Sequence, residues 1–271
     1  MDPLRAAVVQ LHAQDDVDKN MEHALEGVRR ARDDGARLVV LPENFAYMGP
    51  EEKKRAIAET LGDGPITRAL CEEAKRLGVW IVAGGMPERS DDAQRPYNTA
   101  PVISPEGHII GAYRKIHLFD VALADGTVLK ESDATCAGRG EPLVVDVEGA
   151  AMGVTICYDV RFPELYRALG QRGARIVVVP AAFTLTTGKD HWHTLLKARA
   201  IENQVFVLAA AQWGTHPRGR RTYGKSIIVD PWGDVLAQCA EGEGVATARL
   251  DFSYQDRVRQ ELPALQHRVL S

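Results

Sequence analysis

Cys157 is the first candidate for a catalytic residue, because its surroundings suit a nucleophile. It closes the apolar run 152–157 and precedes the sequence Tyr158-Asp159-Val160-Arg161-Phe162-Pro163. We expect a strand over 152–157 and a helix over 163–172, which would place the thiol at a strand-to-helix elbow. At such an elbow the side chain is exposed, and the next backbone N–H can stabilise an oxyanion. The alternative is a small buried hydrophobic residue, and the other three cysteines have no comparable setting.

Glu43 and Lys115 are the residues that could activate such a thiol. Glu43 follows the apolar run 37–41 and Pro42, and a carboxylate at the end of a buried strand is costly unless it is paired or functional. Lys115 comes directly after an expected hairpin strand, in an aromatic and apolar stretch flanked by cations. A loop cap for Glu43 and a solvated basic turn for Lys115 are the structural alternatives, and the residues alone leave both open.

Alternating strands and helices must position these residues, and their pattern predicts an α/β fold. Residues 35–45 parallel residues 173–183, and each copy follows one helix and precedes another. The match pairs Glu43 with Ala181. It indicates two pseudo-symmetric halves in a single domain, 1–271, with two sheets face to face and helices outside; a generic helix-to-strand connection is the alternative.

We expect strands at 4–10, 37–41, 80–83, 97–104, 108–113, 143–147, 152–157, 176–179, 205–211, 226–229, 234–238 and 244–250, and helices at 17–33, 51–61, 66–77, 163–172 and 191–203.

The composition narrows the classes of partner and compartment. The 271 residues are 45% hydrophobic and 26% charged, which is ordinary for a globular protein. The net charge of −4 gives no basic excess, so nucleic acid is not an expected partner. No apolar run approaches the roughly 20 residues of a membrane helix, and no signal peptide is apparent at the start. With four scattered cysteines and no disulfide framework, we expect a cytoplasmic protein that binds neither nucleic acid nor membranes.

Three segments together carry a family resemblance. Residues 41–45 (Leu-Pro-Glu-Asn-Phe), 113–118 (Tyr-Arg-Lys-Ile-His-Leu) and 157–164 (Cys-Tyr-Asp-Val-Arg-Phe-Pro-Glu) resemble the signature segments of the nitrilase superfamily, the carbon–nitrogen hydrolases. They occur in the family's order, and the resemblance extends from Leu4 to about Arg268. Because three motifs coincide, they favour the chemical interpretation of each residue over its structural alternative.

The resemblance implies a four-layer αββα sandwich and a Glu43-Lys115-Cys157 triad, with Glu131 as a second glutamate near it. A thiol of ordinary pKa, near 8.5, is mostly protonated at neutral pH, so it needs a base or a cation. Glu43 can take the thiol proton, and Lys115 with the Tyr158 N–H can stabilise the oxyanion. Attack on an amide would release an amine and leave a thioester for water to hydrolyse, with neither a metal nor an organic cofactor.

Residues beyond the triad point to one branch of the family. Residues 184–204 resemble the amidase branch that contains omega-amidase and deaminated-glutathione amidase, and residues 209–212 and 262–268 favour the latter. We therefore expect an amidase acting on a small carboxylate-bearing amide, deaminated glutathione first. The alternatives are an omega-amidase acting on 2-oxoglutaramate or 2-oxosuccinamate, a nitrilase, or a non-catalytic scaffold. The sequence departs from the branch at 121–126 and at Lys225, and both places are expected to border the substrate pocket.

Residues near the triad indicate how a substrate is bound, and the resemblance implies a partner. The guanidinium of Arg161, four residues after Cys157, suits a substrate carboxylate, although a salt bridge to Asp159 or Glu164 is an equal alternative. Tyr158 and Lys225 are the further expected substrate-binding residues. A homodimer is expected through the helices at 163–172 and 191–203.

Overall fold

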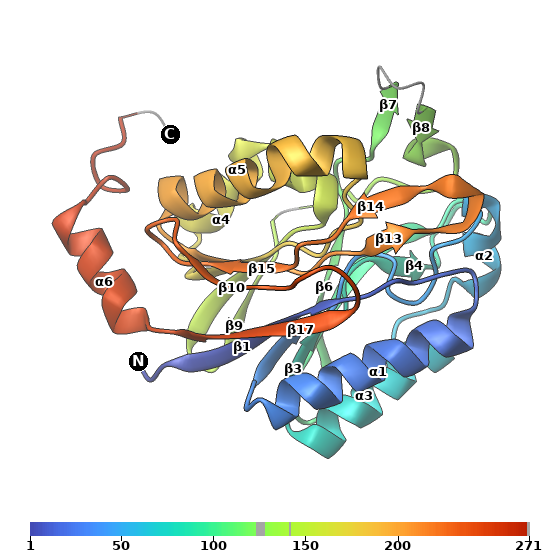
Figure 1. Ribbon diagram of the computed structural model, residues 1–271, viewed down its shortest axis with the longest axis horizontal. Coiled ribbons are helices and arrows are strands. Elements are labelled where there is room, and N and C mark those ends of the chain that lie inside the picture. The colour runs from blue at the N-terminus through green and yellow to red at the C-terminus, as the bar shows by residue number, and fades with distance from the viewer. Residues whose placement is uncertain (123–127, 141, 270–271) are drawn as a thin grey trace.

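The computed structural model describes residues 1–122, 128–140 and 142–269, and it contains two large sheets packed face to face with helices on both outer faces (Figure 1). This is the predicted four-layer αββα sandwich. The first sheet has the order β17 (Gly244–Leu250), β1 (Leu4–Gln10), β2 (Leu38–Val40), β3 (Trp80–Val82), β5 (Tyr97–Ile103) and β4 (Met86–Glu88), with β6 (Ile109–Arg114) paired to β5. The second has the order β16 (Val235–Gln238), β15 (Ile227–Val229), β12 (Phe206–Ala209), β11 (Ile176–Val178), β10 (Ala150–Val154) and β9 (Val144–Val147).

Strands buried on both faces explain the continuous apolar runs of the sequence. In β1, Ala6 and Val8 face the core shared by the two sheets, whereas Ala7 and Val9 face the core beneath the outer helices. Those helices are α1 (Val17–Asp33) and α3 (Pro65–Leu77) on the first sheet, and α4 (Pro163–Gln171) and α5 (Leu185–Asn203) on the second (Figure 1).

The two halves are related strand by strand, as the internal repeat predicted. In one half β2 lies between its parallel neighbours β1 and β3, and in the other β11 lies between its parallel neighbours β10 and β12. Antiparallel strands flank each trio on both sides, namely β17 and β5 in the first sheet and β9 and β15 in the second. The loops that follow β2 and β11 therefore occupy equivalent places.

The helix expected over 51–61 is wrong in its second half. The structure has a 3₁₀ turn, Glu51–Lys53, and a short helix α2, Lys54–Ile57, after which the chain becomes extended at Ala58. Glu59 is used differently, because its carboxylate accepts hydrogen bonds from the Ile66 and Thr67 N–H groups at 3.1 and 2.7 Å. It thereby caps the first turn of α3, where the N–H groups have no partners within the helix.

Several other boundaries differ from expectation. The strand expected over 152–157 ends at Val154, and Cys157 instead begins a 3₁₀ turn, Cys157–Arg161. The helix expected at 191–203 begins earlier, at Leu185. Elements that the pattern missed are β4, β7 (Asp120–Ala122), β8 (Val128–Lys130), a 3₁₀ turn at Glu131–Asp133, β13 (Trp213–Thr215), a 3₁₀ turn at Pro217–Gly219, β14 (Arg221–Tyr223) and α6 (Phe252–Glu261). Of the departure at 121–126, residues 123–126 lie outside the described residues.

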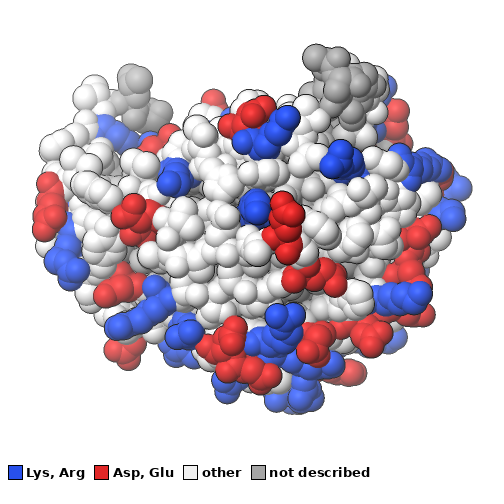
Figure 2. All heavy atoms as spheres, viewed as in Figure 1, with Lys and Arg blue, Asp and Glu red and all other residues white. Residues whose placement is uncertain are grey.

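The surface agrees with a small net charge. Figure 2 shows basic and acidic side chains intermixed on one face, most densely along its lower part, where α1 and α3 lie. Among the described helices, none is both long and apolar enough to cross a membrane.

Candidate active site

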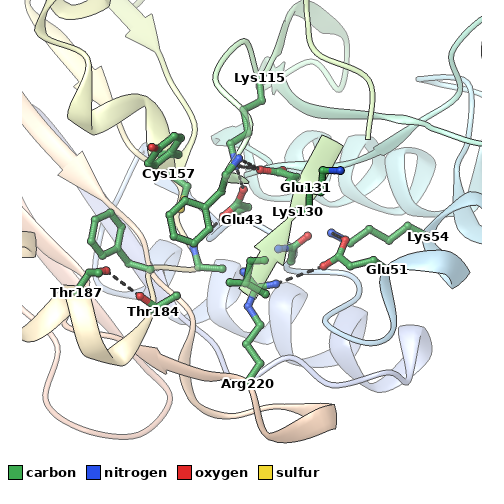
Figure 3. Close-up of a pocket in the computed structure, with 16 residues that line it drawn as sticks. Glu43, Glu51, Lys54, Lys115, Lys130, Glu131, Cys157, Thr184, Thr187 and Arg220 are labelled. Carbon is green, nitrogen blue, oxygen red and sulfur yellow. Dashed lines mark hydrogen bonds and ion pairs between the residues drawn. The ribbon is translucent and has the colours of Figure 1, made fainter. Parts of the chain in front are cut away.

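Four of the predicted site residues meet in one pocket, although they come from distant segments (Figure 3). Glu43 lies in the loop after β2, Lys115 directly after β6, Glu131 directly after β8 and Cys157 three residues after β10. All four line the pocket, together with Asn44, Glu51, Lys54, Phe119, Leu129, Lys130, Tyr158, Ala182, Phe183, Thr184, Thr187 and Arg220.

The Lys115 ammonium joins the two glutamates. Its Nζ lies 2.9 Å from Glu43 Oε1 and 2.8 and 3.1 Å from the two oxygens of Glu131. The side chains of Lys115 and Glu43 are only 2% and 3% exposed. Buried charges of this kind must be paired to be tolerated, and this cluster pairs one cation with two carboxylates.

Asn98 completes the same cluster and was missed by the sequence analysis. Its Nδ2 donates to Glu43 Oε1 at 2.9 Å and to Glu131 Oε1 at 3.2 Å. The β5–β6 hairpin accounts for its position, since the Lys115 N–H donates to the Asn98 carbonyl at 2.9 Å. The expected hairpin register was the signal that could have found it, because it sets a polar residue of one strand beside Lys115.

The loop of the second half holds Glu43 from the other side. Ala182 N–H donates to Glu43 Oε2 at 2.9 Å, and Ala182 follows Ala181, the repeat partner of Glu43. Gln212 Nε2 also donates to the Glu43 carbonyl at 3.1 Å. The loops after β2 and β11 thus meet at the site. The loop after β11 has alanine in place of the glutamate, and its backbone orients the Glu43 carboxylate of the other loop.

The charges set the protonation of the site. Burial alone would raise the pKa of the Glu43 carboxyl, but the Lys115 ammonium outweighs burial and lowers that pKa to about 2. Burial would lower the pKa of Lys115, but Glu131 and Glu43 raise it well above its usual value. Burial, followed by the Glu43 charge, raises the pKa of the Cys157 thiol well above its usual value. At neutral pH the resting site therefore holds a neutral thiol beside an ionised Glu43, which is the arrangement of a nucleophile and its general base.

Cys157 occupies a strained position in the backbone. Its φ is +49°, a left-handed conformation that costs a non-glycine residue about 1–2 kcal/mol. The Cys157 N–H donates to the Pro180 carbonyl at 2.8 Å, which fixes the turn against the loop after β11. The thiol, 8% exposed as a residue, is thereby directed into the pocket.

Asp159 anchors the turn and is fully buried. Its carboxylate accepts from Tyr113 Oη at 2.8 Å and from the Ile156 N–H at 2.8 Å, and lies 2.7 Å from His117 Nδ1. Tyr113 and His117 flank Lys115 in sequence, so one carboxylate ties the segment of the cation to the turn of the nucleophile. In the sequence analysis Asp159 had been considered only as a partner for Arg161.

The three expected substrate-binding residues lie in different places. Tyr158 lines the pocket. Arg161 does not line it; its guanidinium carbon lies 5.1 Å from the centroid of the Phe183 ring, which is part of the pocket wall. Within the described chain Arg161 forms no ion pair with Asp159 or Glu164; its Nη atoms lie 3.4 Å from His191 Nδ1.

Lys225 also lies outside the pocket lining, and its backbone carbonyl accepts from Trp192 Nε1 at 2.9 Å. Contact of Arg161 and Lys225 with a substrate stays a prediction. The additional pocket cations are Lys54, Lys130 and Arg220, of which Lys54 is paired with Glu51 at 2.7 Å. The sequence analysis did not single out Arg220, which lies in the arginine-rich segment 218–221.

The arrangement supports acyl transfer to a thiol. It supplies a nucleophile, an ionised carboxylate in the same pocket that can act as a base, and a fixed ammonium that can stabilise an oxyanion. No group of three or more His, Cys, Asp and Glu residues in the described part of the chain is arranged to hold a metal ion.

Comparison with known proteins gives a consistent result. The family model described as carbon-nitrogen hydrolase matches residues 5–260. The chain is 44% identical to the deaminated glutathione amidase of Synechocystis sp. over 99% of each chain. It is 39% identical to the NitFhit protein of C. elegans, whose crystal structure superposes with a TM-score of 0.93 over 98% of this chain and 65% of that one. It is 30% identical to Saccharomyces cerevisiae Nit3, a member of the nitrilase superfamily, with a TM-score of 0.88 over 99% of this chain and 97% of that one.

Proposed function

This chain belongs to the carbon–nitrogen hydrolase family and is an amidase, and from that premise we propose that it hydrolyses deaminated glutathione through a thioester on Cys157. Deaminated glutathione is glutathione whose amino group has become a keto group. Cleavage of its amide would give 2-oxoglutarate and cysteinylglycine. The similarity to the Synechocystis sp. amidase supports the substrate, and the single observation that carries the mechanism is the Lys115 ammonium bridging two buried carboxylates beside Cys157.

In the first half-reaction the Cys157 sulfur attacks the amide carbon while Glu43 accepts the thiol proton. The oxyanion that forms is stabilised by the Lys115 ammonium and by the Tyr158 N–H, which stands in the first turn after Cys157, where N–H groups have no partner within the turn. The C–N bond then breaks, Glu43 returns its proton to the leaving nitrogen, and the free amine departs. The acyl group remains on sulfur as a thioester.

In the second half-reaction water attacks the thioester and Glu43 accepts a proton from it. The C–S bond breaks, the acid is released, and the proton returns to the Cys157 sulfur. Glu131 holds Lys115 in place through both of its oxygens and itself accepts from the Phe119 N–H at 2.7 Å. It is therefore a positioning residue that keeps the ammonium fixed while charge develops on the substrate.

The substrate assignment predicts a ranking of kcat/KM values for the purified protein. We expect the highest value for deaminated glutathione, a lower one for 2-oxoglutaramate, and negligible turnover of a nitrile of similar size. Release of 2-oxoglutarate, followed by a coupled dehydrogenase assay, measures the two amides directly. Faster turnover of 2-oxoglutaramate would identify an omega-amidase instead, and no turnover of either amide would contradict both substrate assignments.

We also propose a homodimer that uses α4 and α5. Exposed apolar side chains support it, since Ile201 on α5 is 50% exposed and lies against Gly233, whose chain neighbour Trp232 is 54% exposed. Light scattering at micromolar concentration should give a molar mass of twice that of one chain. In the Ile201→Glu variant the molar mass should fall to that of a single chain. A wild-type protein that is monomeric and fully active would contradict the dimer.

A further inference from the structure

A second, larger chamber adjoins the catalytic pocket. The two share Glu51, Leu129, Thr184 and Arg220 as walls. The chamber has a volume of about 590 Å³, against about 60 Å³ for the pocket that contains Cys157. The larger value falls in the range of small-molecule sites, roughly 300–1,000 Å³. A substrate whose reacting carbonyl lies at Cys157 can therefore extend past Arg220 into the chamber.

Arginines dominate the charge of the chamber. Arg218, Arg220 and Arg221 line it, and Glu51 is the one acidic residue in its described lining. Arg218 is paired with Glu52, and an Nη of Arg220 lies 3.3 Å from Glu51 Oε1. Arg221 at the start of β14 is exposed and, among the described residues, has no carboxylate partner.

Arg220 lines both spaces, and the close-up of the catalytic pocket shows its side chain beside Glu51 (Figure 3). Its Nε is buried and has no hydrogen-bond partner among the described residues. Buried donors in proteins are nearly always satisfied, so an unpaired N–H beside a cavity indicates an acceptor that arrives with a ligand. A ligand could therefore use two groups here, the unpaired Nε of Arg220 between the two spaces and the unpaired guanidinium of Arg221 in the chamber.

The order of the reaction determines which half of the substrate uses this chamber. The acyl group stays bonded to Cys157 until water releases it, so it must remain in the small pocket. The amine departs first and water then takes its place, so the amine must lie on the side that leads outward. Ammonia would need no chamber of this size, whereas a dipeptide amine needs space beyond the catalytic pocket.

We propose that this chamber binds the leaving amine of the substrate and that Arg221, together with Arg220, binds a free carboxylate on that amine. The proposal rests on the proposed amidase function and deepens it. It restricts the preferred substrates to N-substituted amides whose amine portion ends in a carboxylate, as peptides do. A guanidinium suits this role, because its planar donor pairs match a carboxylate.

Three substrates separate this proposal from the function on which it rests. They are deaminated glutathione, its C-terminal amide, which lacks the terminal charge, and 2-oxoglutaramate, whose leaving group is ammonia. We expect wild-type enzyme to prefer the acid over its C-terminal amide about five- to tenfold in kcat/KM, the range for a partly exposed charged contact. Arg221→Gln should abolish that preference through KM and leave 2-oxoglutaramate unchanged, whereas Arg221→Lys should retain part of it.

Arg249→Gln is the matched control, because Arg249 is an exposed arginine on β17, away from the chamber. This variant should leave kcat/KM unchanged for all three substrates. Equal wild-type turnover of the acid and its C-terminal amide, or an equal loss on all three substrates in Arg221→Gln, would overturn the proposed subsite. Failure of the wild-type enzyme to cleave deaminated glutathione at all would instead overturn the proposed function.

Discussion

Lys115→Met is expected to lower amidase activity strongly and to destabilise the fold at neutral pH. Methionine fills a similar volume but leaves Glu43 and Glu131 buried without their shared cation. Removing one partner of a buried ion pair costs about 3–5 kcal/mol, and loss of one group that stabilises the oxyanion costs about 10²- to 10³-fold in kcat. Urea unfolding and steady-state kinetics measure the two effects separately.

The loss of stability in Lys115→Met should depend on pH with a definite sign. Without the ammonium, burial raises the pKa of the Glu43 carboxyl above its unfolded value. The folded state then binds more protons than the unfolded state, so the variant's deficit is largest at neutral pH and shrinks toward pH 4. A deficit that is the same at pH 4 and pH 7 would show that the two carboxylates do not share Lys115.

Two further variants keep this test informative. The double variant Lys115→Met, Glu131→Gln removes one of the two buried carboxylates that lack a cation. It should therefore recover part of the stability at pH 7 but none of the activity. Lys75→Met, on the exposed side of α3, makes the same substitution away from the site. It should change neither the stability at pH 7 nor the amidase activity. Recovery of activity in the double variant would contradict the role of Lys115 at the oxyanion.

Cys157→Ala is expected to lower kcat/KM by about 10⁶-fold, the order of loss when another hydrolase loses its nucleophile. Stability should change little, because the substitution removes a single atom from a pocket wall. The residual rate should be measured with deaminated glutathione at high enzyme concentration. Normal activity in this variant would remove Cys157 from the mechanism.

The backbone at Cys157 permits a sharper comparison. Its φ of +49° is accessible to glycine without strain, so Cys157→Gly should be at least as stable as Cys157→Ala while equally inactive. Cys239 is also buried, at 6% exposed, but lies outside the pocket. Cys239→Ala should therefore retain full activity. A glycine variant markedly less stable than the alanine variant would contradict strain at the elbow.

Much of the architecture followed from local patterns. Leu4–Gln10 and Gly244–Leu250 are strands with the expected bounds. The first is largely apolar because it is buried on both faces. The repeat at 35–45 and 173–183 correctly predicted two pseudo-symmetric halves, and each half contains a trio of parallel strands. The helix over 51–61 failed because Glu59 serves α3, a role set by tertiary contact and invisible to helical periodicity.

The site residues divide in the same way. Glu43, Lys115, Glu131 and Cys157 were found because a family pattern marks them, and the structure brings all four to one pocket. Asn98 and Asp159 have no motif of their own, and their importance comes from strand register and from burial of a carboxylate among three donors. Arg161 was chosen for its nearness to Cys157 in sequence, but the 3₁₀ turn after Cys157 places it against Phe183 instead of in the pocket lining.

The central claim is that Cys157 carries the acyl group between the two half-reactions. Its most direct test is rapid acid quenching of wild-type enzyme during turnover of deaminated glutathione, followed by mass analysis of the protein and its peptides. Acid preserves a thioester, so we predict one 2-oxoglutaryl adduct per chain that maps to Cys157 and disappears as substrate is exhausted. Turnover without any adduct, or an adduct that maps to Cys71, Cys136 or Cys239, would contradict the mechanism.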